Sequence, residues 1–217
     1  VIKDELVEIR DKYGDERRSI IEYSGGDVSI EDLIADENVV ITISHAGYIK
    51  RTNLSEYKTQ NRGGVGQKSA GTRDQDFLEH LFVATNHQYM LFFTQKGKCF
   101  WMRVYEIPEG SKTSKGRAIQ NLINIENDDK VKAFICTQDL KNEEYINSHY
   151  VIMATKQGQV KKTLLEQYSR PRQNGIAAIT IKEDDELLEA KLTNGKSQIL
   201  VAVKSGKLVR FEESKTR

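Results

Sequence analysis

A few residues have types that could do chemistry. Gly63-Gly64-Val65-Gly66-Gln67-Lys68-Ser69 looks like a phosphate-binding P-loop, but that motif needs Gly directly before Lys-Ser, where Gln67 stands. Ser44 and His45 are adjacent, as a nucleophile and its base could be, but they fall in an expected turn with no orienting carboxylate indicated. A nucleotide site and a hydrolase are therefore disfavoured, and no catalytic residue is predicted.

Metal chemistry is equally poorly supported. Cys99 and Cys136 stand alone without a Cys-x-x-Cys spacing, and the four histidines are scattered. The carboxylate-rich stretches 126–129 and 184–186 lie at matching places before expected strands, so they are interpreted as acidic turns. We predict no metal site, no disulfide and no cofactor. Without a signal-peptide pattern or a membrane-length apolar run, the cytoplasm is the expected compartment.

The segment 60–66, Gln-Asn-Arg-Gly-Gly-Val-Gly, is more informative. Three glycines in four residues allow a backbone to approach a ligand closely, and the amides together with Arg62 could contact phosphates. The alternative is a mobile loop with ordinary turn glycines. The segment cannot act alone, so the elements that would position it matter.

An internal repeat supplies those elements. Each copy has an apolar β-branched or aromatic stretch, a polar turn with Gly, and a second stretch that carries basic residues, the pattern of a β-hairpin. The copies are 39–51, 89–103, 150–162 and 198–210. Their turn glycines Gly47, Gly97, Gly158 and Gly206 are 50, 61 and 48 residues apart, and the long gap contains 139–149, interpreted as an inserted surface loop.

The similarity extends beyond the hairpins. The first three copies reach a second glycine, Gly64, Gly116 or Gly175, 17 to 19 residues after the turn. An apolar strand also precedes each later hairpin, at 81–84, 131–136 and 187–192. Several strands per unit at a period near 50 indicate an all-β, propeller-like fold of four-stranded blades. The alternative is an ordinary antiparallel sandwich with coincidental hairpins.

The first residues differ from the repeats. Residues 1–18 are highly charged, with Ile2, Leu6 and Ile9 near helical spacing, which predicts a short N-terminal helix. Gly25-Gly26 is expected to interrupt regular secondary structure, and 29–34 is expected to form a short helical turn. We therefore divide the chain into 1–24, a helix with a linker, and 25–217, three full repeats and part of a fourth.

The charges are sorted by repeat. The net charge is only +1, yet the windows 39–66, 89–118, 150–178 and 198–211 hold 18 Lys and Arg against 4 Asp and Glu, leaving −13 elsewhere. Basic residues follow each turn, and equivalent places in a ring of blades would form a curved cationic track. Duplex DNA, with one charge per roughly 1.7 Å of axis, suits such a track. The alternative is lysines that protect exposed strand edges.

The chain resembles the C-terminal part of the A subunits of bacterial DNA gyrases. Residues 4–6 and 12–18 look like the end of the coiled-coil arm of that family, and the hairpins look like blades of its β-pinwheel. The segment 60–66 resembles the gyrase box, with the family pattern Gln-Arg-Arg-Gly-Gly-Lys/Arg-Gly. Asn61 and Val65 replace two cations of the box, which implies a weaker electrostatic grip there.

The resemblance implies a function. The domain would bind and wrap duplex DNA for a type IIA topoisomerase, supporting ATP-dependent negative supercoiling by an A2B2 holoenzyme with gyrase B. ATP and Mg would belong to other parts of that bacterial holoenzyme, and no membrane partner is expected. The alternatives are the C-terminal domain of the topoisomerase IV A protein and a propeller-like protein-interaction scaffold.

The expected DNA-binding residues combine the hairpin cations, the box and the basic residues near the second glycines. They are Lys50, Arg51, Lys58, Gln60, Arg62, Gly63, Gly64, Gly66, Lys98, Arg103, Lys112, Lys115, Arg117, Lys161, Lys162, Arg170, Arg172, Lys207 and Arg210.

Overall fold

The computed structural model describes residues 2–16, 18–19, 30–57, 62–64, 66, 71–72 and 75–216. The chain divides into a unit of residues 1–33 and a unit of residues 34–217, and each is described by itself. The first contains α1 (Ile2–Tyr13), whose side chains are all exposed, and the single-turn 3₁₀ helix η1 (Ile30–Leu33). The predicted N-terminal helix and the helical turn are thus confirmed, although the apolar face of α1 has no partner among the described residues of its unit.

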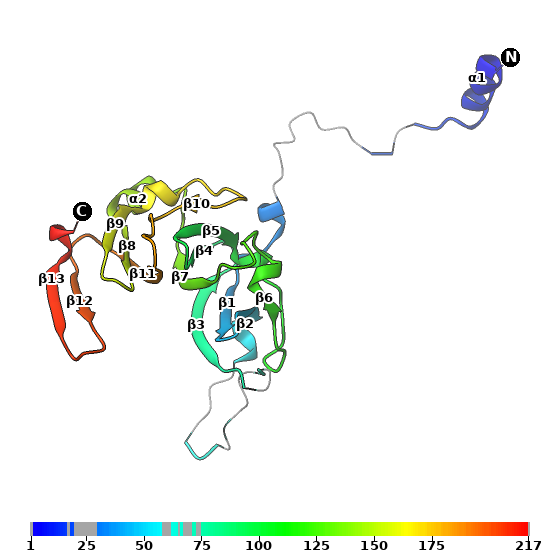
Figure 1. Ribbon diagram of the computed structural model, residues 1–217. Coiled ribbons are helices and arrows are strands. Elements are labelled where there is room, and N and C mark those ends of the chain that lie inside the picture. Colours follow the sequence, from blue (N-terminus) through cyan, green and yellow to red (C-terminus); the bar gives the residue numbers. More distant parts are fainter. Residues whose placement is uncertain are drawn as a thin grey trace. The chain divides into compact units, whose positions relative to one another are not determined.

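The second unit is built from antiparallel sheets (Figure 1). Its strands are β1 (Asn38–Ser44), β2 (Tyr48–Asn53), β3 (Leu78–Thr85), β4 (Tyr89–Thr94), β5 (Lys98–Arg103), β6 (Arg117–Ala118), β7 (Val131–Thr137), β8 (Tyr150–Thr155), β9 (Val160–Leu164), β10 (Ile176–Ala177), β11 (Leu187–Thr193), β12 (Gln198–Ala202) and β13 (Leu208–Glu212). All four predicted hairpins and the three additional strands are present. The all-β, propeller-like prediction is confirmed.

The blades exchange strands. The first sheet has the order β3-β1-β2-β6 and the second has β10-β5-β4-β7, so each contains a two-residue strand from the following repeat. β6 pairs with Tyr48 and Ile49 of β2, and β10 pairs with Lys98 and Cys99 of β5. The third sheet, β11-β8-β9, and the pair β12-β13 make up the rest of the described strands. Each short strand begins directly after a second glycine of the repeat.

Apolar burial between the blades holds the unit together. Because neighbouring residues of a strand point to opposite faces, Met90 and Phe92 pack toward the first blade, whereas Leu91 and Phe93 pack toward the third. The exposed fraction of all four side chains is 0%. β4 is therefore apolar along its length, as expected for a strand buried on both faces.

The insertion 139–149 is predicted to be a surface loop, but the structure contains the helix α2 (Glu143–Ser148) within it. Asn142 caps this helix, its side-chain oxygen accepting the amide of Tyr145 at 3.0 Å, and Glu143 and Glu144 fill the first turn. One helical turn carries too little periodicity to be predicted from apolar spacing. α2 packs on the 3₁₀ helix η5 (Leu165–Tyr168), next to the basic segment 170–172.

The exchanged strands require glycine at a specific place. Gly175 has φ +68°, and a Cβ there would lie 2.8 Å from both the Cys99 carbonyl oxygen and the Phe100 ring. Gly158 has φ +87° in a hairpin turn, but its Cβ would meet nothing within 4 Å. The two glycines therefore share the backbone strain that a side chain would introduce, and only Gly175 adds steric overlap.

Replacing Gly175 with Ala should thus destabilise the protein more than replacing Gly158 with Ala. We expect about 1–2 kcal/mol for Gly158→Ala from backbone strain, and a further ~1–3 kcal/mol for Gly175→Ala from overpacking. Urea unfolding of both variants measures the difference. Equal losses would mean that the close approach of Gly175 to β5 is absent.

Candidate nucleic-acid interface

The hairpin turns are held by carboxylates from the acidic connections. In each of the first three repeats an Asp before the following outer strand accepts a turn amide, and a hydroxyl at the end of the first strand accepts another. The amides of Ala46, Lys96 and Gln157 donate to Asp76, Asp129 and Asp185 at 2.9, 3.1 and 2.9 Å. The interpretation of 126–129 and 184–186 as acidic turns is consistent with this geometry, and the described residues contain no cluster suited to a metal ion.

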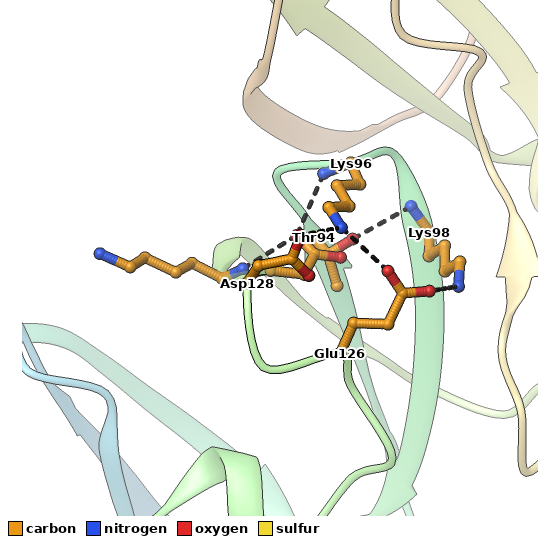
Figure 2. Close-up of polar contacts among 7 residues, drawn as sticks. Thr94, Lys96, Lys98, Glu126 and Asp128 are labelled. Carbon is orange, nitrogen blue, oxygen red and sulfur yellow. Dashed lines mark hydrogen bonds and ion pairs between the residues drawn. The ribbon is translucent and has the colours of Figure 1, made fainter.

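The turn lysines of the second repeat are neutralised by the same connection (Figure 2). Lys96 Nζ lies 2.9 Å from Glu126 and 2.7 Å from Asp128, and Lys98 Nζ lies 2.6 Å from Glu126. These hydrogen bonds, first from Lys98 and then from Lys96, lower the pKa of Glu126 to about 2. The expected DNA-binding residue Lys98 is therefore already paired. The acidic connection 126–129 contacts the basic hairpin of its own repeat through these ion pairs.

The cations of the second hairpin strands are directed into the protein. Lys50 is 3% exposed, and its ammonium donates to the carbonyl oxygens of Ser111, Lys112 and Ser114 at 2.8, 2.6 and 2.9 Å. Burial lowers the pKa of Lys50, an effect that Glu56 opposes. Lys161 Nζ donates to the Ala178 carbonyl at 2.6 Å. The Lys50 ammonium, with three acceptors, is not available to a phosphate, whereas Lys161 is partly exposed with one described acceptor and stays an expected DNA-binding residue.

Arg51 and Lys162 make contacts between repeats. Arg51 donates to the Ile107 carbonyl at 2.9 Å and lies 3.2 Å from Glu109. Lys162 lies 3.6 Å from Glu213, which is 0% exposed, and 4.2 Å from the Tyr150 ring centroid. Both side chains are mostly buried, with 19% and 15% exposed. They join neighbouring repeats, so they too are left out of the surface.

Arg103 is not in register with Arg51 in the repeat. It follows Gly97 by six residues, and the residue in register with Arg51 is Trp101. Trp101 Nε1 donates to the Tyr168 carbonyl at 2.9 Å, at the same place in the next repeat as Ile107, the partner of Arg51. Arg103 itself stacks on Tyr89 at 3.8 Å and donates to the His87 carbonyl. Arg51 and Trp101, which are in register, thus make the same contact with the following repeat. The pattern of charges did not reveal this contact, because Trp101 is uncharged.

The remaining expected residues are more accessible. Lys112 is half-buried, 4.8 Å from the Tyr57 ring centroid. Seven basic positions before or near the second glycines and in the last hairpin are exposed: Arg62, Lys115, Arg117, Arg170, Arg172, Lys207 and Arg210. Within the described part of the chain, Lys115, Arg117, Arg170 and Arg172 form no side-chain hydrogen bond or ion pair. Arg117 is the first residue of the exchanged strand β6, and Lys115, Arg170 and Arg172 precede β6 or β10 in the chain.

The box is described only in part. Arg62, Gly63, Gly64 and Gly66 are exposed, with φ +91° at Gly63 and +26° at Gly66. Lys58 and Gln60, as well as the two departures Asn61 and Val65, lie outside the described residues. Farther along, the amide of Gly71 donates to the Lys112 carbonyl at 3.2 Å, so the segment after the box contacts the loop 110–116.

His45 has a carboxylate beside it, contrary to expectation. Its Nδ1 lies 3.0 Å from Glu79, and its ring stacks on Phe77 at 4.8 Å. The Ser44 hydroxyl, however, is buried and accepts the Tyr48 amide at 3.2 Å. This pair holds a turn, and the geometry gives no support to a hydrolase.

The repeats match a known family. The model of the DNA gyrase C-terminal domain, a β-propeller, matches residues 38–85, 88–138 and 149–194. The chain is 45% identical to the DNA gyrase A protein of Neisseria gonorrhoeae over 213 residues, 98% of the chain and 23% of that protein. It is 41% identical to the DNA gyrase A protein of Clostridium acetobutylicum, over 100% of the chain and 26% of that protein. The chain thus spans about a quarter of these relatives.

Solved structures show the same fold. The C-terminal domain of a DNA topoisomerase IV superimposes with a TM-score of 0.68 at 30% identity, covering 83% of this chain and 53% of that one. A DNA gyrase A C-terminal domain gives 0.62 at 22% identity, covering 83% and 56%. Among the described helices, none is long and apolar enough to cross a membrane.

The pairing of Glu126 gives a test by pH. Because its pKa in the folded protein, about 2, is below the ordinary value of about 4.3, its contribution to stability is present above the ordinary value and is lost as pH falls toward 2. Lys98→Met should raise the pKa of Glu126, measured by carboxyl-carbon NMR, and flatten the acid dependence of stability. Lys204→Met, an exposed lysine in the fourth turn, is the control. An unchanged Glu126 titration in Lys98→Met would contradict the pairing.

Proposed function

The chain belongs to the DNA gyrase C-terminal domain family of β-propellers, and on this premise we propose that it binds and bends duplex DNA along cations at the exchanged-strand edges of its blades. The observation that carries the proposal is the set Lys115, Arg117, Arg170 and Arg172, exposed and without described ion-pair partners. Exposed cations without partners can neutralise phosphates without first breaking an internal ion pair.

The positions of these cations support bending. Lys115 and Arg117 flank Gly116 in one repeat, and Arg170 and Arg172 precede Gly175 in the next. Each set lies where a short strand from one repeat completes the blade of the repeat before it. Because the two sets lie in or before the exchanged strands of successive repeats, a duplex that contacts both would have to follow the turn from blade to blade, and phosphate contacts would supply the energy for that deformation.

The wider role is also a proposal. As part of a gyrase A protein, the domain would present wrapped DNA for strand passage in an A2B2 holoenzyme in the bacterial cytoplasm. Gyrase B and the ATP and Mg chemistry would be contributed outside this chain. The residues described here would bind and orient DNA and perform no bond-breaking step.

A second candidate is the corresponding domain of topoisomerase IV. It is favoured by the 30% identity and TM-score of 0.68 to the solved C-terminal domain of such an enzyme. Both candidates would bind DNA, and the gyrase candidate carries the added expectation that the DNA is wrapped with a defined handedness. A measurement of DNA topology therefore separates them.

Binding should depend on the exposed arginines and on salt. We expect Arg170→Ala/Arg172→Ala to weaken binding of all duplex sequences alike and to reduce the slope of log K against log salt by about 1.8, or ~0.9 per phosphate contact. Fluorescence anisotropy with a labelled linear duplex measures both quantities.

The matched control is Lys96→Ala/Lys98→Ala, which removes the same charge from an ion-paired site. It should change the slope far less than the arginine pair. Equal effects of the two double variants would exclude the blade-edge cations as the particular contact surface. No duplex binding by the unmodified chain at low salt would refute the proposed function itself.

Chiral wrapping requires a separate measurement. A relaxed closed plasmid incubated with the protein and a nicking-closing enzyme should acquire a changed linking number after deproteinisation, with the sign giving the handedness. Arg170→Ala/Arg172→Ala should reduce the change. An unchanged linking number with intact binding would favour the topoisomerase IV-like role over that of gyrase.

A further inference from the structure

The loop 110–117 is shaped by side chains of the preceding blade. It carries three cations of the expected surface: Lys112, Lys115 and Arg117. Four of its carbonyl oxygens accept hydrogen bonds from side chains of β2. Lys50 Nζ binds those of residues 111, 112 and 114, and the Thr52 hydroxyl donates to that of Gly110 at 2.8 Å.

The direction of these carbonyls fixes the direction of the amides. In a trans peptide the C=O and N–H point to opposite sides. With the carbonyls of Lys112 and Ser114 turned toward Lys50, the amides of Thr113 and Lys115 point away from it. Thr113 and Lys115 are exposed, and neither amide has a backbone partner within the described chain. Unpaired amides beside lysine and arginine side chains are groups that bind phosphate oxygens.

We propose that Lys50 is a positioning residue for DNA binding, which acts by holding the loop 110–117 so that its amides and three cations face phosphates. Lys50 itself does not touch DNA, because it is 3% exposed and its three donors already have three acceptors. A buried charge without partners is costly, so the ammonium keeps these carbonyls turned inward. This inference rests on the proposed DNA binding.

The second blade supports the equivalent segment through a different kind of contact. The residue in register with Lys50 is Phe100, which is 2% exposed and lies beneath Gly175 in the equivalent segment. An apolar ring can support a segment by packing, but it has no donor that could hold carbonyl oxygens in a fixed direction. Lys50 is therefore a local device of the first blade, and its removal should affect the loop 110–117 without affecting Arg170 and Arg172.

The test compares Lys50→Met with the surface variant Lys112→Ala/Lys115→Ala/Arg117→Ala in the complete 217-residue chain. Kd for a linear duplex is measured by anisotropy over a salt series. Lys50→Met should reduce the salt slope by more than ~0.9, and up to about 2.7, although it removes one charge. Combined with the surface variant, it should weaken binding by less than the sum of the two separate effects. Addition of inorganic phosphate should shift the NMR amide signals of Thr113 and Lys115 in the unmodified chain and not in Lys50→Met.

Other results would overturn the inference. A slope reduced by ~0.9 and additive with the surface variant would make Lys50 a direct phosphate contact, and an unchanged Kd in a folded Lys50→Met would show that the loop needs no positioning. Thermal unfolding checks the fold. Should Lys50→Met fail to fold, the phosphate titration of the unmodified chain decides, because amide signals of Thr113 and Lys115 that do not shift would overturn the inference. Absence of duplex binding by the unmodified chain would be the distinct failure of the proposed function.

Discussion

The structure depends on the pairing of the first two hairpin edges with a short strand from the next repeat. A blade that ended at β2 or β5 would leave a row of unpaired backbone groups. β6 and β10 satisfy this edge with only two residues each, and they can do so because Gly116 and Gly175 adopt φ +76° and +68° against carbonyl oxygens of the preceding hairpin. The order of the blades and the placement of the exposed cations both follow from this exchange.

The cations divide into those with an internal partner and those that are exposed. On the turns and second strands of the first three hairpins they find carbonyls or carboxylates, as Lys98 finds Glu126 and Lys162 finds Glu213. Lys207 and Arg210 of the fourth hairpin are exposed, as are Lys115, Arg117, Arg170 and Arg172 in or before the exchanged strands. A nearly neutral chain can therefore present exposed cations although those of its first three hairpins are paired internally.

Sequence reasoning predicted the hairpins and outer strands because alternating apolar residues and turn glycines act locally. It could not predict β6 or β10, since two residues carry no periodicity. It could not predict the contacts of Lys50 and Lys161, because their acceptors are carbonyls 61 and 17 residues away that only the fold brings near. Trp101 gave one available signal: an indole in register with Arg51 points to a shared buried donor more than to a shared charge.

The exchange would also link the proposed DNA binding to blade closure. Lys112, Lys115 and Arg117 lie within six residues of one another, on the segment whose last residues form β6. Their mutual repulsion opposes the closed segment, while three hydrogen bonds from the buried Lys50 ammonium favour it. A polyanion that binds only the closed arrangement stabilises it by mass action. On the proposed function, phosphate binding and strand exchange would therefore reinforce each other.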